Sequence, residues 1–212
     1  MGPAAPHGTG SGIRSGIPAL AVLSRCLPRG LSAFCGHSGS GKSTICEQLA
    51  THCSAVVFQM DWCLTSADGG PGWQYLDNCD TEYMDSVLKR LLRGRDVRFT
   101  PRHPRYRDRL GTFTIAPKRI VLLDGVTSLW STAAREKAGL RVIVTAPRDI
   151  REQRQLERYR LTDPLFARTS EVEVVATIQA KRAFEDVQVS AQRALCDLEL
   201  RTHPVLSVRR LR

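Results

Sequence analysis

Residues 34–44 read FCGHSGSGKST, and this stretch decides the fold. From Gly36 to Ser43 the letters fit G-x-x-x-x-G-K-[ST], the pattern of a glycine-rich turn whose backbone N–H groups surround a phosphate. The apolar run before the turn, 31–35, predicts a buried strand, and the residues after it predict a helix. Because strand, turn and helix follow in this order, we interpret the stretch as a phosphate-binding loop.

Further apolar runs recur along the chain at roughly regular intervals. They are continuous rather than alternating, which is typical of buried parallel strands, and they lie at 55–58, 119–124, 140–145 and, more weakly, 195–200. The segments between them read as helices at 43–52, 83–92, 149–160 and 171–194. Strands that alternate with helices predict an α/β fold with a doubly wound parallel sheet of five strands and helices on both faces.

Length and composition fit a single domain. The chain has 212 residues, of which 42% are hydrophobic, enough for one well-buried core. Residues 1–16 are rich in Gly, Ser, Pro and Ala and predict a disordered tail, which leaves 17–212 as the folded domain. We expect a cytoplasmic protein without a membrane partner, because neither a long apolar run nor a signal-peptide pattern is present.

Cysteine spacing and charge argue against other classes. The seven cysteines are scattered and never form C-x-x-C, so neither a zinc site nor a disulfide framework is expected. The net charge is +10, but the arginines are spread over the whole length, and we expect no nucleic-acid partner. A polyphosphate ligand explains part of the arginine excess, and a codon bias toward arginine is the alternative.

The loop predicts ATP and Mg²⁺ as cofactors. Lys42 would reach the β- and γ-phosphates, and the Ser43 hydroxyl would ligate Mg²⁺. The predicted ATP-binding residues of the loop are Gly36, His37, Ser38, Gly39, Ser40, Gly41, Lys42, Ser43 and Thr44. The sequence has no N-K-x-D motif for guanine and no second domain of a motor ATPase, so a small kinase is favoured.

Two aspartates directly follow predicted strands, where open α/β sheets assemble their sites. Asp61 would accept the proton of an acceptor hydroxyl and help to hold Mg²⁺, while Asp124 would hold Mg²⁺ together with Ser43. The alternatives are that Asp61 caps a helix and that Asp124 belongs to a local Asp-Gly turn.

Arginines gather on one predicted helix. Arg151, Arg154 and Arg158 share a face of 149–160, and turned inward they would close over ATP and neutralise charge on the transferred group. We predict that Arg151 and Arg154 bind ATP and that Arg158 is catalytic beside Lys42 and Asp61. Solvated arginines on an exposed helix are the alternative.

The segment PRHPRYRDRLG, 101–111, shows neither helical nor strand periodicity and predicts a binding loop. Its basic and aromatic side chains would stack on a base or grip a sugar, and the candidates are His103, Tyr106 and Arg109. An isolated surface loop is the alternative interpretation.

Over about residues 31–160 the chain resembles the uridine kinase and phosphoribulokinase group of P-loop kinases, especially short bacterial uridine kinase-like proteins. The motifs that carry the resemblance are SGSGKST at 38–44, the acid of MDW at 60–62, LLRGRDV at 91–97 after Asp77 and Asp80, PRY with DRLG at 104–111, LLDG at 122–125, and Arg151, Arg154 and Arg158. The chain departs from the group's pattern at Trp62, Arg107, Asp124 and Tyr159.

The resemblance implies a sheet order of 2-3-1-4-5, an arginine-rich lid, ATP with Mg²⁺, and transfer of phosphate to a hydroxyl of a nucleoside-type small molecule. It also implies that Asp77 and Asp80 line the ribose site, with Tyr106 over the base. The departures lie where acceptor and lid meet, so we expect a nucleoside-like natural product rather than uridine, as in antibiotic biosynthesis or resistance.

Other functions stay open at this point. A nucleoside monophosphate kinase would need arginines at an acceptor phosphate. A non-catalytic nucleotide-switched regulator or nucleic-acid binder would use the loop without transferring phosphate. A homo-oligomer is also open.

Overall fold

The structure, a computed structural model, describes residues 17–66, 77–162 and 170–212. Its main sheet has six strands in the order β2-β5-β1-β6-β7-β8, all parallel except β8. The strands are β1 (Gly30–Cys35), β2 (Val56–Gln59), β5 (Ile120–Asp124), β6 (Ala138–Thr145), β7 (Leu198–Arg201) and β8 (Ser207–Arg210). The five predicted strands therefore lie in the order 2-3-1-4-5, which confirms the predicted topology.

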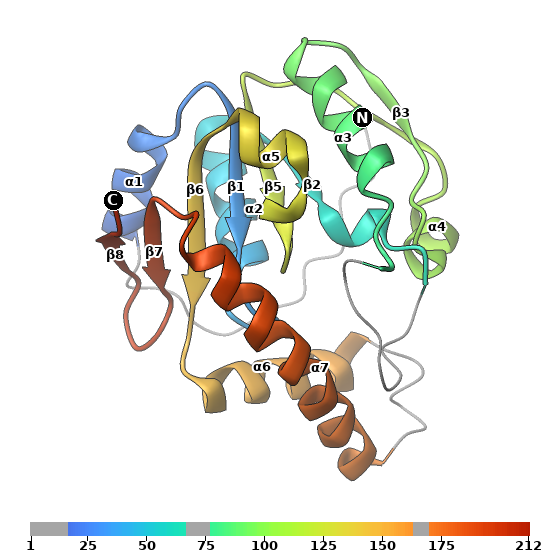
Figure 1. Cartoon of the computed structure of the whole chain (residues 1–212), viewed down its shortest axis with the longest axis vertical. Helices are drawn as coiled ribbons and strands as arrows, with labels where there is room; N and C mark the ends of the chain where they lie inside the picture. The colour runs from blue at the N-terminus through green and yellow to red at the C-terminus, as the bar shows by residue number, and fades with distance from the viewer. Residues whose placement is uncertain (1–16, 67–76, 163–169) are drawn as a thin grey trace.

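Helices cover both faces of this sheet (Figure 1). Side chains alternate across a strand, so Phe34 packs on one face with Ile45 and Leu49, and Ala33 and Cys35 pack on the other. The helices are α1 (Ile17–Cys26) and α2 (Lys42–Cys53) on the Phe34 face, and α3 (Thr81–Leu92), α5 (Thr132–Lys137) and α7 (Glu171–Arg193) on the opposite face. Two buried clusters result, one on each side of the sheet.

A small layer lies beside the main sheet. Strands β3 (Val97–Phe99) and β4 (Phe113–Ile115) form an antiparallel pair, and α4 (Pro104–Leu110) lies between them in the chain. The described residues also form two 3₁₀ helices, η1 (Met60–Cys63) and η2 (Ser128–Trp130). The predicted loop at 101–111 is therefore wrong, because most of it is helix. His103 caps that helix by accepting a hydrogen bond from the Arg105 N–H at 3.2 Å.

The register of the parallel strands brings the functional segments to one edge. Asp124 pairs with Phe34 on β1 and with Gln59 on β2, so the residues after these strands meet at their carboxyl ends. Helix α6 (Arg148–Thr162) lies beyond the same edge, next to the first half of α7 (Figure 1).

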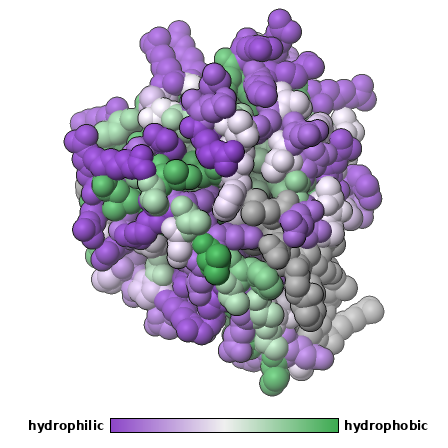
Figure 2. All heavy atoms as spheres, in the orientation of Figure 1, coloured by the Kyte–Doolittle hydropathy of each residue, from purple (hydrophilic) through white to green (hydrophobic). Residues whose placement is uncertain are grey.

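Hydrophilic residues cover most of the face seen in Figure 2. No helix in the described ranges has the length and hydropathy needed to cross a membrane. All seven cysteines are free thiols. The tail predicted at 1–16 lies outside the described residues.

Candidate functional site

The loop between β1 and α2 is shaped by close backbone contacts that only glycine permits. Gly36 (φ +140°) lies against the carbonyl group of Val144, and Gly39 (φ +77°) lies against that of Arg151. A Cβ at either position would clash with a carbonyl oxygen. The loop is therefore held tightly between the end of β6 and the start of α6.

Helix α2 directs its free N–H groups into this loop. Its N-cap is Gly41, which offers no side-chain acceptor, so the first turn of the helix is left to bind an anion. Lys42 is 8% exposed, and its Nζ donates to the His37 carbonyl oxygen at 3.3 Å. Residues 36–44 thus form a preorganised cradle with one ammonium group at its mouth.

Asp124 is buried at the end of β5, beside Lys42 and Ser43. Burial raises its pKa to about 6, although the charge of Lys42 and a hydrogen bond from Ser43 act against this, and the charge of Asp61 adds to it. Its Oδ1 has no hydrogen-bond partner within the described chain. A buried carboxylate oxygen without a partner is costly unless a ligand satisfies it.

These groups fit Mg²⁺. The cation takes oxygen ligands, binds proteins through one or two carboxylates and retains several waters. Asp124, Ser43 and, from the neighbouring segment, Asp61 supply such a set. In the described residues no group of three or more His, Cys, Asp or Glu side chains could form an all-protein cage.

Asp61 lies in η1, two residues beyond β2, as predicted. Neither neighbouring helix uses it as a cap, since Gln59 precedes η1 and Asp80 caps α3, so the capping alternative is wrong. Its negative charge raises the pKa of Asp124 and of Tyr106. Asp61 therefore lies at the carboxyl edge of the sheet, two residues after the register partner of Asp124.

Trp62 fixes this segment in place. Its ring packs against those of Phe58, Phe99 and Phe113, with centroids 5.4–5.8 Å apart. Its carbonyl oxygen accepts hydrogen bonds from the backbone N–H groups of Arg102 at 2.7 Å and His103 at 3.4 Å. The segment that carries Asp61 is thus tied to the start of α4.

Tyr106 on α4 is close enough to Asp61 for the charge of that carboxylate to act on its hydroxyl group. Burial, helped by the charge of Asp61, raises the pKa of Tyr106 to about 12, and the nearby guanidinium groups of Arg158, Arg105 and Arg109 act in the opposite direction. Arg109 lies 5.3 Å over the Tyr106 ring. The structure therefore brings Tyr106, Arg109 and Arg158 together near Asp61.

Other predicted acceptor residues have local roles. Asp80 caps α3 by accepting from the Tyr83 N–H at 2.9 Å, and it pairs with Arg102 at 3.2 Å. His103 is buried as the cap of α4, and Asp77 is exposed. Substrate binding by these three residues stays a prediction.

The predicted arginine lid is docked on the phosphate loop. Arg154 donates to the Gly39 carbonyl oxygen at 3.3 Å and to the Thr202 hydroxyl at 3.0 Å. Burial lowers the pKa of Arg151 and of Arg154. The Nε of Arg151 is buried without a hydrogen-bond partner among the described residues, and a phosphate oxygen would satisfy it.

Sequence reasoning missed the residues that hold the loop from its outer side. Thr202 donates from its hydroxyl to the Ser40 carbonyl oxygen at 2.7 Å. Glu185 and Asp186 of α7 accept hydrogen bonds from Ser38 and His37. No local sequence motif predicts these contacts, because the contacting residues are more than 140 positions from the loop in the chain.

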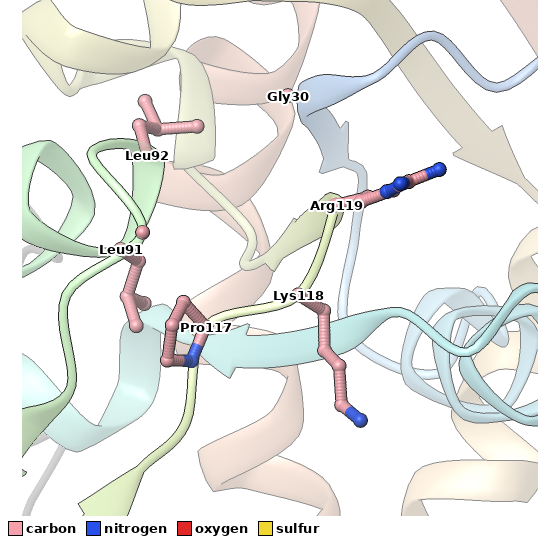
Figure 3. A pocket seen from close by; sticks show the side chains of 7 residues that line it. Gly30, Leu91, Leu92, Pro117, Lys118 and Arg119 are labelled. Carbon is pink, nitrogen blue, oxygen red and sulfur yellow. The ribbon is translucent and has the colours of Figure 1, made fainter.

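A shallow hollow of about 350 Å³ lies elsewhere, at the start of β1 and β5 (Figure 3). It is lined by Gly30, Leu91, Leu92, Gly94, Pro117, Lys118 and Arg119. Because it lies at the opposite end of the strands from Asp124, it is not part of the phosphate site.

Residues 33–176 match the family model described as "AAA domain". The chain belongs to this family of P-loop proteins. A uridine kinase from Leuconostoc citreum (strain KM20) is 27% identical over 139 residues, which cover 58% of this chain and 65% of that protein. The match therefore spans slightly less than two thirds of the relative, and it agrees with the resemblance drawn from the motifs.

Two solved structures share the fold. A candidate fructose transport system kinase from Silicibacter sp. TM1040 is 20% identical with a TM-score of 0.61, and the match covers 81% of this chain and 94% of that one. A candidate uridine kinase from Bacillus stearothermophilus is 19% identical with a TM-score of 0.51, covering 73% and 93%. The α/β fold of P-loop proteins is thus shown, and nucleoside triphosphate binding follows from its loop.

Proposed function

We propose that this chain is an ATP-dependent kinase that transfers the γ-phosphoryl group to a hydroxyl of a nucleoside or nucleoside-like natural product. The observation that carries the proposal is the position of Asp61, which follows Gln59, the register partner of Asp124, in a segment whose Trp62 carbonyl oxygen holds the start of α4. A carboxylate in this position suits the base that removes the proton of an acceptor hydroxyl. The uridine kinase relative supports the same class.

In this mechanism Asp61 takes the proton of the acceptor hydroxyl. The acceptor oxygen attacks the γ-phosphorus, and the bond between that phosphorus and the ADP oxygen breaks. Lys42 and the arginines of α6 neutralise charge on the phosphoryl oxygens. Bound Mg²⁺, held by Asp124 and Ser43, would supply charge neutralisation across the phosphates. Helix α6, packed on Gly39, would in this mechanism keep water from the transferred group and so limit hydrolysis.

Acceptor-dependent ADP release tests the proposal directly. The screen covers nucleosides, nucleoside monophosphates, nucleoside antibiotics, sugars and pantothenate. With the acceptor it finds, Asp61→Asn should lower kcat by at least about 100-fold and leave ATP affinity unchanged. The exposed Asp108→Asn on α4 is the matched control. Transfer by Asp61→Asn at the wild-type rate would refute the assigned base.

A nucleoside monophosphate kinase is the second candidate. It is favoured by the three guanidinium groups of Arg105, Arg109 and Arg158 around Tyr106, a setting suited to a charged acceptor. For this function, Arg109→Met should raise KM for the monophosphate more than tenfold, an effect of about 1.4 kcal/mol or more. Release of ADP with nucleosides but not with monophosphates would exclude it, and no release with any acceptor would favour a nucleotide-switched regulator.

A further inference from the structure

Ser38, the third residue of the phosphate loop, is held from two helices at once. Its backbone N–H donates to Glu185 Oε2 at 2.9 Å, and its hydroxyl donates to Glu185 Oε1 at 2.5 Å. Its carbonyl oxygen accepts from Gln155 Nε2 at 3.1 Å. Glu185 is 3% exposed and Gln155 is 7% exposed, so both side chains that hold Ser38 are buried.

The geometry of one peptide group shows on which side of the loop Glu185 acts. The His37 carbonyl oxygen accepts a hydrogen bond from Lys42 Nζ, and the N–H of the same peptide unit belongs to Ser38. In a planar trans peptide the C=O and N–H bonds point in opposite directions. The Ser38 N–H therefore points away from Lys42, and Glu185 lies outside the cradle, not in the place of the anion.

We propose that Glu185 is a positioning residue, which fixes the orientation of the His37–Ser38 peptide and through it the ammonium group of Lys42. This inference rests on the proposed function, in which Lys42 binds the terminal phosphates of ATP. The Ser40 N–H also donates to the His37 carbonyl oxygen, at 3.1 Å, so Glu185 holds the N–H side of this peptide and Ser40 holds the C=O side. A flipped peptide would break both hydrogen bonds to the carbonyl, including the one that anchors Lys42, and turn the Ser38 N–H into the cradle.

A carboxylate suits this role better than an amide. It is an acceptor only and offers one oxygen to each donor of Ser38, whereas glutamine would present an NH₂ group to one of them. Arg182 of α7 lies nearby and pairs with Glu152 of α6, which joins the two helices beside Ser38. Burial and the positive charges of Arg148 and Arg151 lower the pKa of Arg182, while the negative charges of Asp186 and Glu185 oppose this shift, so Arg182 interacts with the buried carboxylate.

The test is a cycle of ATP dissociation constants for the full chain carrying Glu185→Gln, Lys42→Ala or both. Glu185→Gln should weaken ATP binding by about tenfold, as expected for loss of a charge-assisted hydrogen bond. In the Lys42→Ala background the same change should have no further effect, because Glu185 acts through Lys42. Equal losses in both backgrounds, or no loss in either, would overturn the inference.

Two further variants separate positioning from folding. Ser38→Ala removes only the hydroxyl donor and should weaken ATP binding by a smaller factor, again only when Lys42 is present. Glu171→Gln removes an exposed carboxylate from the same helix and should leave ATP binding unchanged. Wild-type unfolding temperatures in these variants show that the fold is intact.

A crystal structure of Glu185→Gln provides an independent readout. We expect the His37–Ser38 peptide to rotate and Lys42 to lose its bond to the His37 carbonyl oxygen. An unchanged peptide and Lys42 would overturn the inference. These experiments use no acceptor. If no acceptor supported ADP release and the kinase proposal failed, the ATP-binding and crystallographic results would still test the role of Glu185.

Discussion

At the scale of single residues, the carboxyl group of Asp124 is placed to hold Mg²⁺, but its burial destabilises the folded chain. Its carboxyl group is buried beside Lys42, with one oxygen that no described residue satisfies. The pKa of about 6 in the folded chain lies above the ordinary value of 3.8. Between these values the folded state binds more protons than the unfolded state, so stability falls as the pH rises through this window.

Asp124→Asn should therefore stabilise the nucleotide-free protein above about pH 6, by at most about 2–3 kcal/mol, and have little effect below about pH 4. The same variant should lose Mg²⁺-dependent phosphoryl transfer. Urea unfolding at pH 4 and pH 8 measures the first effect. A stability difference that does not change with pH would contradict the account.

Residues close to a motif could be predicted, and residues brought in by tertiary packing could not. The loop from Gly36 to Ser43 and the acids after two strands follow from local pattern and from where parallel strands end. Glu185 contacts Ser38 across 147 positions of sequence, and no periodicity distinguishes it from other acids of a long helix. Asp80 has an equally local signal, but the signal was that of a helix cap.

At the scale of elements, α6 and the phosphate loop are packed backbone to backbone. Gly39 lies against the Arg151 carbonyl group with a positive φ, so any side chain there must push the helix away. Gly94 has a similar φ of +70°, but a Cβ at Gly94 would meet no atom within 4 Å among the described residues. Alanine substitutions at Gly39 and Gly94 therefore separate the cost of backbone strain from the cost of lost packing.

Gly94→Ala should cost about 1–2 kcal/mol of unfolding free energy, since it bears only the left-handed strain. Gly39→Ala should cost more and should also weaken ATP binding, because α6 can no longer dock. Urea unfolding and ATP titration of both variants measure these effects. Equal stability losses with intact ATP binding would show that α6 does not support the loop.

The junction of α7 with β7 depends on Glu199, which is 3% exposed. Burial alone would raise its pKa, but hydrogen bonds from Arg193 and Thr145 and the charges of Arg193 and Arg201 outweigh it, so the pKa lies below 4.5. A depressed pKa adds stability above the ordinary value, and this stability is lost as the pH falls through the folded value.

Glu199→Gln should accordingly destabilise the chain at pH 7 by about 1–3 kcal/mol, with the difference disappearing in acid. Thermal unfolding from pH 3 to pH 8 gives the comparison. Above neutral pH the expected change in unfolding free energy has the opposite sign to that of Asp124→Asn, so the two variants control for each other. A loss that persists in acid would point to packing instead of charge.

Short elements were the hardest to predict. Helix α4 has seven residues and buries none of them completely, so no hydrophobic periodicity marks it. Its cap is a histidine, not one of the usual Ser, Thr, Asp or Asn residues. Strands β3 and β4 do alternate buried and exposed residues, but with three residues each they are too short for the alternation to be recognised. Strand β8 is fully exposed and has no apolar face.

At the scale of the whole molecule, the sheet could be predicted because its five parallel strands are buried on both faces. Continuous apolar runs at regular spacing leave few topologies open, and the observed order is one of them. What binds at the carboxyl edge is a property of the fully folded chain. Ligand binding there should stabilise the whole domain.

Mg²⁺ and ATP at about 100 times the dissociation constant should stabilise the fold by about 2.7 kcal/mol. For a chain of this size that is a rise in Tm of roughly 5–11 °C. Lys42→Ala should abolish most of the shift, and differential scanning fluorimetry measures it. A rise of equal size in the variant would show that the nucleotide binds elsewhere.

The most direct test of the central claim is a crystal structure with Mg²⁺ and a nonhydrolysable ATP analogue. We predict the β-phosphate within the N–H groups of residues 39–43, Lys42 at the terminal phosphates, the metal beside Ser43 and Asp124, and Asp61 facing the γ-phosphate. A phosphate chain bound outside the loop, or Asp61 directed away from the γ-phosphate, would contradict the account.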